Sequence, residues 1–283
     1  MAETFELNFI PHSFPGAIEF DFSLPETEKS YQEASKRFKC PTVINDLRGH
    51  EYKYDLFRNG FKYTRNSLPP DALEQQLMDM TEEEIARVLV PHTEDLVRKL
   101  TGSFRIITAG YRLRNLANDT SRHMNHHGPS HEVHCDFSMA GAMRFAANDL
   151  LKGQETELLH KRMLVVNVWR PLRQVTRDPL AVCDWLSISE QPCGRSNLVP
   201  WKVSFDNGLR QNESLKLKQH DSQRWYYLQN QLPTEPLLFL CFDSHQMQEG
   251  GMTVPHSAFV HPSYSDAEPR ISFEIKFFCF LEN

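Results

Sequence analysis

The chain has 283 residues, of which 40% are hydrophobic and 11% aromatic, enough for a sizeable core in one large domain. Its 31 Lys and Arg against 37 Asp and Glu leave a formal net charge of −6, which argues against a nucleic-acid-binding surface. No apolar run is long enough to span a bilayer, and the amino terminus does not read as a secretion signal. Six scattered cysteines without a C-x-x-C pair favour free thiols and a cytoplasmic protein.

The first part of the chain is predicted to be irregular and then helical. Residues 1–40 contain prolines at 11, 15 and 25 and favour no regular element, and residues 41–66 predict short strands with a turn. The segment 70–101 places apolar residues at helical spacing, and Thr81 before acidic residues is typical of a helix start. We expect Pro91 to divide this segment into two helices or to open a third.

Strands are predicted to dominate after residue 101. Residues 139–160 are rich in Ala and Leu and predict one more helix. Eight other hydrophobic segments predict strands: 104–115, 132–138, 162–172, 179–185, 225–231, 236–244, 257–262 and 270–281. The polar residues 186–224 predict a long loop-like excursion of the kind that forms lids. Helices followed by many strands favour a single domain over residues 1–283, a helix-supported barrel or sandwich.

The segment His134-Cys135-Asp136 is the first candidate for a metal site. Side chains two apart on a strand point to the same face, so one imidazole and one carboxylate can converge on a single point. A histidine from a distant strand would complete a face of two histidines and one carboxylate, which leaves coordination positions open for oxygenase chemistry. The motif alone is weak, because a chain with 13 His contains such spacings by chance.

His256 is the preferred third ligand. It lies in VPHSAFVHP, directly after an apolar predicted strand and 120 residues after Asp136. His261 is the stronger of two alternatives, and His245 is the weaker one. Four further histidines before the motif, at 123, 126, 127 and 131, are expected to line the approach to the pocket or to face water rather than to bind a second metal.

Arg270 and Ser272 are the candidate site for an organic acid. Arg270 follows His256 by 14 residues, and on a strand it shares a face with Ser272. A guanidinium beside a hydroxyl can bind both oxygens of a carboxylate, such as the distal carboxylate of 2-oxoglutarate. The alternative is a surface arginine that pairs with Glu268 or Glu274.

Several stretches together resemble a family of iron- and 2-oxoglutarate-dependent oxygenases of secondary metabolism. The family includes aspergillic acid hydroxylase, relatives of fungal gibberellin desaturase, a cephalosporin methoxylation component and endoperoxide-forming oxygenases of meroterpenoid biosynthesis. The stretch NVWRPL at 167–172, followed by PLAVCD at 179–184, is the most specific. The others are VINDLRGHEYKYDLFRNGFKY at 43–63, VHCDFS at 133–138, and LCFDS, PHSAF and PRISFEIK between residues 240 and 276.

The resemblance implies a mainly β fold with flanking helices around a double-stranded β-helix (jelly-roll or cupin-like) core. It implies Fe(II) held by His134, Asp136 and His256, and 2-oxoglutarate anchored by Arg270. The expected function is hydroxylation, desaturation or endoperoxide formation on an apolar, terpenoid-like natural product in fungal secondary metabolism. The expected partners are that small molecule and dioxygen, without nucleic acid or membrane, and a homodimer stays open. Cys135 departs from the aliphatic residue that many relatives carry there.

Three more residues have two interpretations each. Arg170, on a predicted strand with Asn167 and Trp169 on the other face, either approaches the cosubstrate or forms a structural ion pair with Asp184 or Asp243. Tyr111 either donates a hydrogen bond or a hydrogen atom during catalysis or is a core tyrosine. Trp201, in the excursion, either closes on the substrate or anchors the loop permanently.

Two rival functions remain at the level of sequence. One is a cupin-type metal dioxygenase or isomerase that does not use 2-oxoglutarate, in which Arg270 would be structural. The other is a non-catalytic helper protein of a biosynthetic complex, which an intact ligand triad disfavours.

Overall fold

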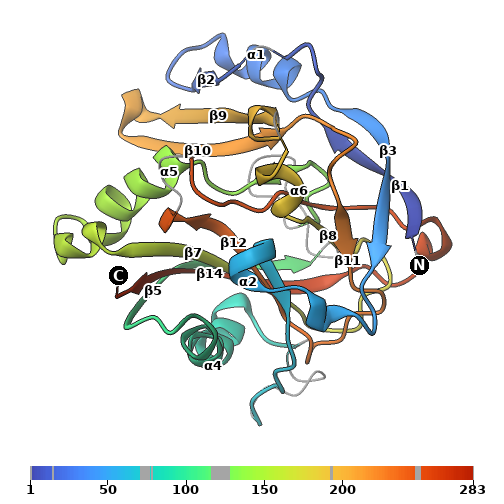
Figure 1. The fold of residues 1–283 in the computed structure, drawn as a ribbon. Coiled ribbons are helices and arrows are strands. Elements are labelled where there is room, and N and C mark those ends of the chain that lie inside the picture. Colours follow the sequence, from blue (N-terminus) through green and yellow to red (C-terminus); the bar gives the residue numbers. More distant parts are fainter. Residues whose placement is uncertain are drawn as a thin grey trace.

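The fold consists of two β-sheets with helices around them (Figure 1). The computed structural model describes residues 2–14, 16–70, 77, 79–115, 128–191, 194–245 and 250–282. The larger sheet comprises β1 (Ala2–Phe9), β2 (Ile18–Asp21), β3 (Phe38–Asp46), β6 (His134–Cys135), β8 (Leu180–Cys183), β9 (Leu198–Phe205), β10 (Arg210–Leu217), β11 (Trp225–Tyr227) and β13 (His256–Ala258). The smaller comprises β4 (Phe61–Tyr63), β5 (Arg105–Asn115), β7 (Arg162–Pro171), β12 (Leu237–Asp243) and β14 (Ile271–Leu281).

The strand order in each sheet is far from the chain order. The larger sheet runs β1-β3-β11-β8-β13-β6-β10-β9-β2, and the smaller runs β4-β12-β7-β14-β5. The α-helices are α1 (Thr27–Ala34), α2 (Leu56–Asn59), α4 (Glu82–Thr101), α5 (Met139–Arg144) and α6 (Leu186–Ser189). Shorter 3-10 or π turns are η1 (Glu51–Lys53), η3 (Phe145–Leu151), η4 (Thr156–His160), η5 (Arg195–Asn197), η6 (Asp206–Gly208) and η8 (Pro262–Tyr264).

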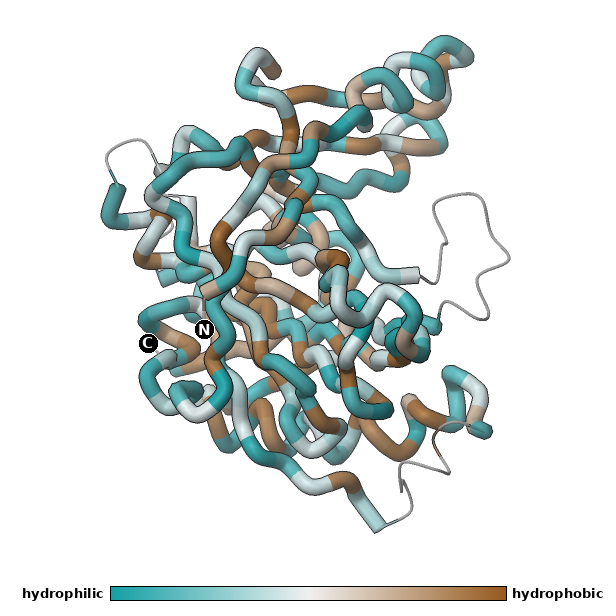
Figure 2. The backbone as a smooth tube through the Cα atoms, turned by 90° about the vertical axis from the view of Figure 1, so that its right-hand side faces the viewer, coloured by the Kyte–Doolittle hydropathy of each residue, from teal (hydrophilic) through white to brown (hydrophobic). Residues whose placement is uncertain are grey.

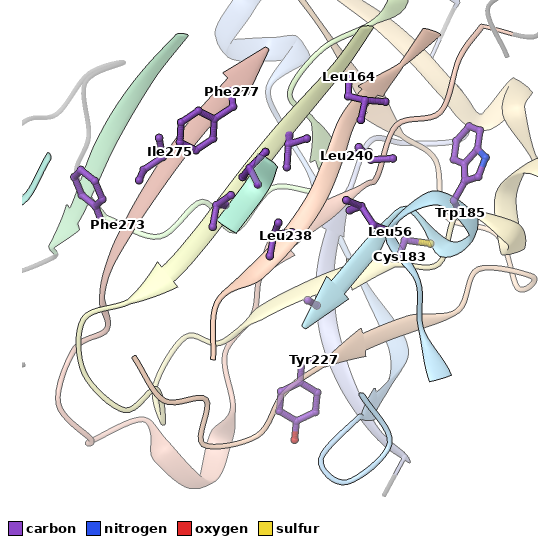
Figure 3. Packing of buried hydrophobic residues seen from close by; sticks show 14 of the residues in the cluster. Leu56, Leu164, Cys183, Trp185, Tyr227, Leu238, Leu240, Phe273, Ile275 and Phe277 are labelled. Carbon is purple, nitrogen blue, oxygen red and sulfur yellow. The ribbon is translucent and has the colours of Figure 1, made fainter. Parts of the chain in front are cut away.

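The two faces of the smaller sheet bury different residues, because side chains alternate along each strand. One face packs under α4, and its strands contribute Leu164, Val166, Val168, Leu238, Leu240, Phe273, Ile275 and Phe277 to one hydrophobic cluster (Figure 3). The opposite face contributes to a second cluster, which also includes Leu180 and Val182 of the larger sheet and Phe137 just after β6. The smaller sheet contributes Val165, Trp169, Leu237, Phe239 and Phe278. Figure 2 shows hydrophobic stretches of backbone running through the interior, with hydrophilic stretches outside.

A β-bulge interrupts this alternation in β12. The register against β7 shifts between Leu240 and Phe242, so Cys241 and Phe242 both join the second cluster. Bulges of this kind re-aim side chains beside active sites. The bulge brings Phe242 onto this face, whereas Cys241 follows the alternation of Leu237 and Phe239 and directs its thiol toward Asp136.

The prediction that residues 1–40 are irregular is wrong. They form β1, β2, α1 and the start of β3, and β1 pairs with β3 along its full length. Phe5, Leu7 and Phe9 alternate into the core, a strand signal that the prolines further along obscured.

The prediction for Pro91 is also wrong, because α4 continues through it. Proline removes one backbone hydrogen bond, but Pro91 lies on the exposed side of the helix, where water can satisfy the freed carbonyl. The predicted start at Thr81 is confirmed: Thr81 and Glu84 form a capping box. Residues 71–76 and 78 of the predicted helical segment 70–101 lie outside the described residues.

The predicted excursion 186–224 is largely regular structure. It contains α6 and the antiparallel pair β9–β10, which extends the larger sheet and packs against β2. The strand pattern was hidden because many of the side chains of β10 are polar and its faces are only partly buried. Among the described residues, no helix combines the length and apolarity needed to cross a membrane.

Substitution of Gly60 tests how tightly the second hydrophobic cluster is packed, because Gly60 lies against Val254 of that cluster. It ends α2 with φ +83°, and an added Cβ would lie 2.4 Å from Cγ2 of Val254. Gly49 has φ +84° but no heavy atom within 4 Å of that position. Gly49→Ala should therefore cost only the left-handed backbone penalty of about 1–2 kcal/mol. Gly60→Ala should cost about 1–3 kcal/mol more, because it also overpacks the core.

Urea unfolding of the two variants measures this difference. Equal losses of unfolding free energy in Gly60→Ala and Gly49→Ala would show that the contact with Val254 relaxes without cost.

Candidate metal centre

The register of two short strands brings the two predicted histidine ligands together. β13 pairs antiparallel with β6, and His256 lies directly opposite His134. Their ring centroids are 4.4 Å apart. Asp136 follows at the turn after β6, and its Oδ1 lies 3.7 Å from Nε2 of His134 and 3.9 Å from Nε2 of His256. One ligand atom from each residue lies within 4.8 Å of the others, so the three can share a single ion.

Backbone hydrogen bonds fix which imidazole nitrogen faces that point. Nδ1 of His134 lies 2.8 Å from the carbonyl oxygen of Glu132, and Nδ1 of His256 lies 3.0 Å from that of Val254. A carbonyl only accepts, so each Nδ1 carries the proton and each Nε2 presents a lone pair. Burial lowers the pKa of His134 to about 3, which keeps the ring neutral as a metal ligand must be.

The second oxygen of Asp136 is held by three side chains of the other sheet. Asn167 donates to Oδ2 at 3.3 Å, the Cys241 thiol donates at 3.1 Å, and Nζ of Lys276 lies 3.3 Å away. Burial raises the pKa of Asp136, but the charge of Lys276 is the largest opposing cause, and the pKa lies well below its usual value. Oδ1 is thereby left to face the histidines as an ionised ligand.

Sequence reasoning did not single out Lys276 or Cys241. A signal for Lys276 was available, since a lysine inside the apolar run of β14 needs a buried partner. Burial and then the charge of Asp136 raise the pKa of Cys241 well above its usual value, so the thiol keeps the proton it donates. Nothing local in the sequence indicates that contact, because it depends on how β12 packs against the larger sheet.

This donor set fits iron(II). Two imidazole nitrogens and one carboxylate oxygen on one side of a metal are the arrangement of non-haem iron oxygenases, with the remaining positions open. A cavity of about 30 Å³ adjoins the three residues and is also lined by Trp169, Phe239 and Arg270.

Arg270 lies in this cavity as a buried cation. It is 4% exposed, its Nη1 donates to the backbone oxygen of Asp178 at 2.6 Å, and its guanidinium lies 5.1 Å over the ring of Trp169. Burial lowers its pKa to about 10, so it stays charged at neutral pH. Within the described residues no carboxylate pairs with it, and its Nε has no hydrogen-bond partner.

Ser272 adds a second donor without a partner. Its side chain is fully buried and its hydroxyl makes no hydrogen bond within the described part of the chain. Buried polar groups are normally satisfied, so two such neighbours on one strand face indicate a missing acceptor. A carboxylate between Arg270 and Ser272 would satisfy both, and this fits the carboxylate of a bound 2-oxo acid.

Arg170 is placed away from the metal, against the interpretation that it binds the cosubstrate. It lies on the opposite face of β7 from Asn167, and its Nη1 donates to the carbonyls of Asn66 and Pro233. Its Nη2 contacts the side chain of Asn66. The alternative ion pairs are also wrong: Asp184 binds Arg224, and Asp243 binds Arg162. The neighbouring Asn167, not Arg170, reaches the metal carboxylate because the faces of a strand alternate.

The position of Trp201 is also against the interpretation that it closes on the substrate. It is 2% exposed in β9 and packs against Phe14, Phe20 and Tyr31, with the Arg37 guanidinium 5.1 Å from its ring. This packing corresponds to the anchor interpretation, in which the indole fixes β9 to the amino-terminal segment. Trp201 stabilises the sheet edge in this arrangement.

The remaining candidates are placed as follows. Tyr111 is 41% exposed on β5, contacts the ring of Phe273 and lines a larger cavity of about 330 Å³ that also reaches Asp136. His261 is buried against Phe5 and Tyr264 and does not join the triad. The histidines at 123, 126 and 127 lie outside the described residues.

The chain is similar to several known proteins over most of its length. A family model described as an oxidoreductase/YMDC permease-like domain matches residues 7–280. The hydroxylase/desaturase CTB9 of Cercospora beticola is 29% identical over 263 residues, which cover 88% of this chain and 79% of the relative. The Fe(II)/2-oxoglutarate-dependent dioxygenase nvfI of Aspergillus novofumigatus is 26% identical over 235 residues, which cover 82% and 80%.

Solved structures extend the similarity to the whole fold. The iron and alpha-ketoglutarate-dependent endoperoxidase NvfI superposes with a TM-score of 0.79 at 22% identity, over 100% of this chain and 99% of that one. The similarity confirms the mainly β, double-stranded β-helix fold with flanking helices.

Metal binding distinguishes the two candidates for the third ligand. His256→Ala should weaken Co(II) or Zn(II) binding by more than about 100-fold, because the loss of a direct ligand exceeds the effect of losing a supporting residue. His261→Ala, which removes an equally buried imidazole, should leave metal affinity unchanged. Chelator competition measures both, and the reverse pattern would make His261 the ligand.

Proposed function

The chain belongs to the oxidoreductase/YMDC permease-like domain family, and from that premise we propose that it is a non-haem iron(II), 2-oxoglutarate-dependent oxygenase. One observation carries the proposal. The open face of His134, Asp136 and His256 shares a cavity with a buried Arg270 that has no carboxylate partner in the described chain. A metal face and an anion site at this proximity are what a chelating, dicarboxylic cosubstrate requires.

The side chains of the site would have separate roles in binding the metal and in orienting its ligands. His134 and His256 would bind iron through Nε2 and Asp136 through Oδ1, and Asn167, Cys241 and Lys276 keep that carboxylate oriented. Bound iron supplies dioxygen activation, coupled to conversion of 2-oxoglutarate to succinate and carbon dioxide.

Arg270 and Ser272 would bind the distal carboxylate of the cosubstrate and set its direction toward the metal. The ring of Trp169 packs on the guanidinium and limits its orientations. Phe239, whose ring centroid lies 4.5 Å from that of His256, closes the other side of the cavity and keeps water away. These groups position and shield the reactants.

The reaction we propose is oxidation of a natural-product scaffold in fungal secondary metabolism, by hydroxylation, desaturation or endoperoxide formation. The similar proteins support this range, since they include fungal proteins named hydroxylase/desaturase and an endoperoxidase. A small-molecule substrate and dioxygen are the partners that follow. The cytoplasm is the proposed compartment, supported by five free cysteines among the described residues.

The cupin-type alternative without 2-oxoglutarate is less favoured by the same cavity. It would require Arg270 to be structural, yet among the described residues only its Nη1 has a hydrogen-bond acceptor and its Nε has no partner. The non-catalytic alternative is disfavoured because all three ligand side chains are present and aligned.

Cosubstrate binding tests the role of Arg270. In Zn(II)-loaded protein, Arg270→Ala should weaken 2-oxoglutarate binding about ten- to a hundredfold, since a charge-assisted hydrogen bond contributes about 1.5–3 kcal/mol. Zn(II) affinity should not change. Calorimetric titration measures both, with Arg210→Ala, a surface arginine paired to Asp206, as the matched control. Unaltered 2-oxoglutarate affinity in Arg270→Ala would favour the cupin-type alternative.

A further inference from the structure

The larger cavity beside the metal centre has a chemical character of its own. It measures about 330 Å³ and reaches Asp136, Asn167 and Lys276, so a molecule in it would lie next to the metal-binding carboxylate. One part of its wall is aromatic, from Phe137 and Phe145. The other part is charged and comes mainly from β5 and β14.

Among the described residues, the charged wall has three cations, Arg112, Arg114 and Lys276, and two carboxylates, Asp136 and Glu274. Lys276 pairs with Asp136 at 3.3 Å, and Arg114 pairs with Glu274 at 2.9 Å. Arg112 is the fifth charged group, and in the part of the chain that the structure describes it has no ion pair or side-chain hydrogen bond. It is half-buried, so its unpaired charge is only partly solvated.

The strand register aims Arg112 into the cavity. Arg112 lies directly opposite Glu274, and Gly110 lies opposite Lys276, on the same face of β5. Gly110 has no side chain, and a Cβ added there would meet no atom within 4 Å. The glycine therefore leaves open the space between Arg112 and the metal side of the cavity.

The aromatic wall is rigid. The rings of Phe137 and Phe145 lie 5.6 Å apart, and Phe145 stacks on Phe278 at 5.4 Å. Phe278 is fully buried in the second hydrophobic cluster, which fixes the position of this wall. Such a surface suits the apolar body of a cyclic molecule.

Building on the proposed function, we propose that the substrate is an acidic natural product whose carboxylate is bound by Arg112 while its apolar ring system packs on Phe137 and Phe145. A guanidinium binds both oxygens of a carboxylate through two parallel hydrogen bonds. A single free cation matches one monovalent carboxylate better than a phosphate dianion. The substrate is thus amphiphilic: it carries a carboxylate in addition to the apolar scaffold expected from sequence.

A pair of matched probes tests this proposal without turnover. Anthracene-2-carboxylate and its neutral amide have the same rings and differ in charge. Both are titrated by fluorescence into Zn(II)-loaded protein saturated with 2-oxoglutarate, so that Arg270 is already occupied. Wild-type protein should bind the carboxylate about ten- to a hundredfold more tightly than the amide.

Variants identify the group responsible for that preference. Arg112→Gln should reduce carboxylate binding to the level of the amide and leave amide binding unchanged, whereas Arg112→Lys should retain part of the preference. Arg105→Gln, on the same strand but paired with Glu155 on the surface, is the matched control and should behave as wild type. Gly110→Leu should abolish binding of both probes because it fills the cavity.

Several results would overturn the proposal. The first is a wild-type protein that does not prefer the carboxylate over the amide, which includes a protein that binds neither probe. The second is an undiminished preference for the carboxylate in Arg112→Gln. The third is undiminished binding of the probes in Gly110→Leu. The probe experiment and the experiment that tests the proposed function can fail independently of each other. Loss of 2-oxoglutarate binding in Arg270→Ala can stand while the probe preference fails, and the probe preference does not depend on Arg270.

Discussion

β6 and β13 lie side by side in antiparallel register, and this register sets His134 directly opposite His256. Both strands are very short, so their position depends on their neighbours β10 and β8, which pair with them on either side. A slip of one residue would turn one imidazole to the other face of the sheet. The metal site therefore depends on the order of strands in the larger sheet.

The position of Asp136 makes the metal site depend on the smaller sheet as well. Its Oδ1 faces the histidines of the larger sheet, while its Oδ2 is held by Asn167, Cys241 and Lys276 from β7, β12 and β14 of the smaller one. The metal carboxylate thus links the inner faces of the two sheets. The same three strands also contribute side chains to the second hydrophobic cluster, so the metal site and this part of the core are built on the same strands.

Sequence predicts those parts of the site that depend on local spacing. His134 and Asp136 are two apart and Arg270 and Ser272 are two apart, and in each pair strand alternation was sufficient to put both on one face. The preference for His256 over His261 followed from its place after an apolar strand. Nothing local could show that Asn167, rather than Arg170, meets Asp136, or that the Cys241 thiol donates to the same carboxylate, because both contacts depend on how distant strands pack together.

The fold was predictable in class but not in all its elements. The apolar strands of the smaller sheet were predicted correctly because both of their faces are buried and their runs are continuous. The strands β1, β2, β9 and β10 were missed because they lie toward the two ends of the larger sheet, where proline and polar residues are tolerated. The same edge position agrees with the second of the two interpretations of Trp201, in which it anchors the sheet and does not close on the substrate.

The central claim is that one cavity holds both iron and 2-oxoglutarate. Anaerobic absorption spectroscopy tests it most directly, because a 2-oxo acid that chelates Fe(II) gives a weak visible charge-transfer band. The account predicts that the band forms when both Fe(II) and 2-oxoglutarate are added to the wild-type protein, and that neither alone produces it. A protein that binds Fe(II) tightly yet shows no band at saturating 2-oxoglutarate would contradict the account.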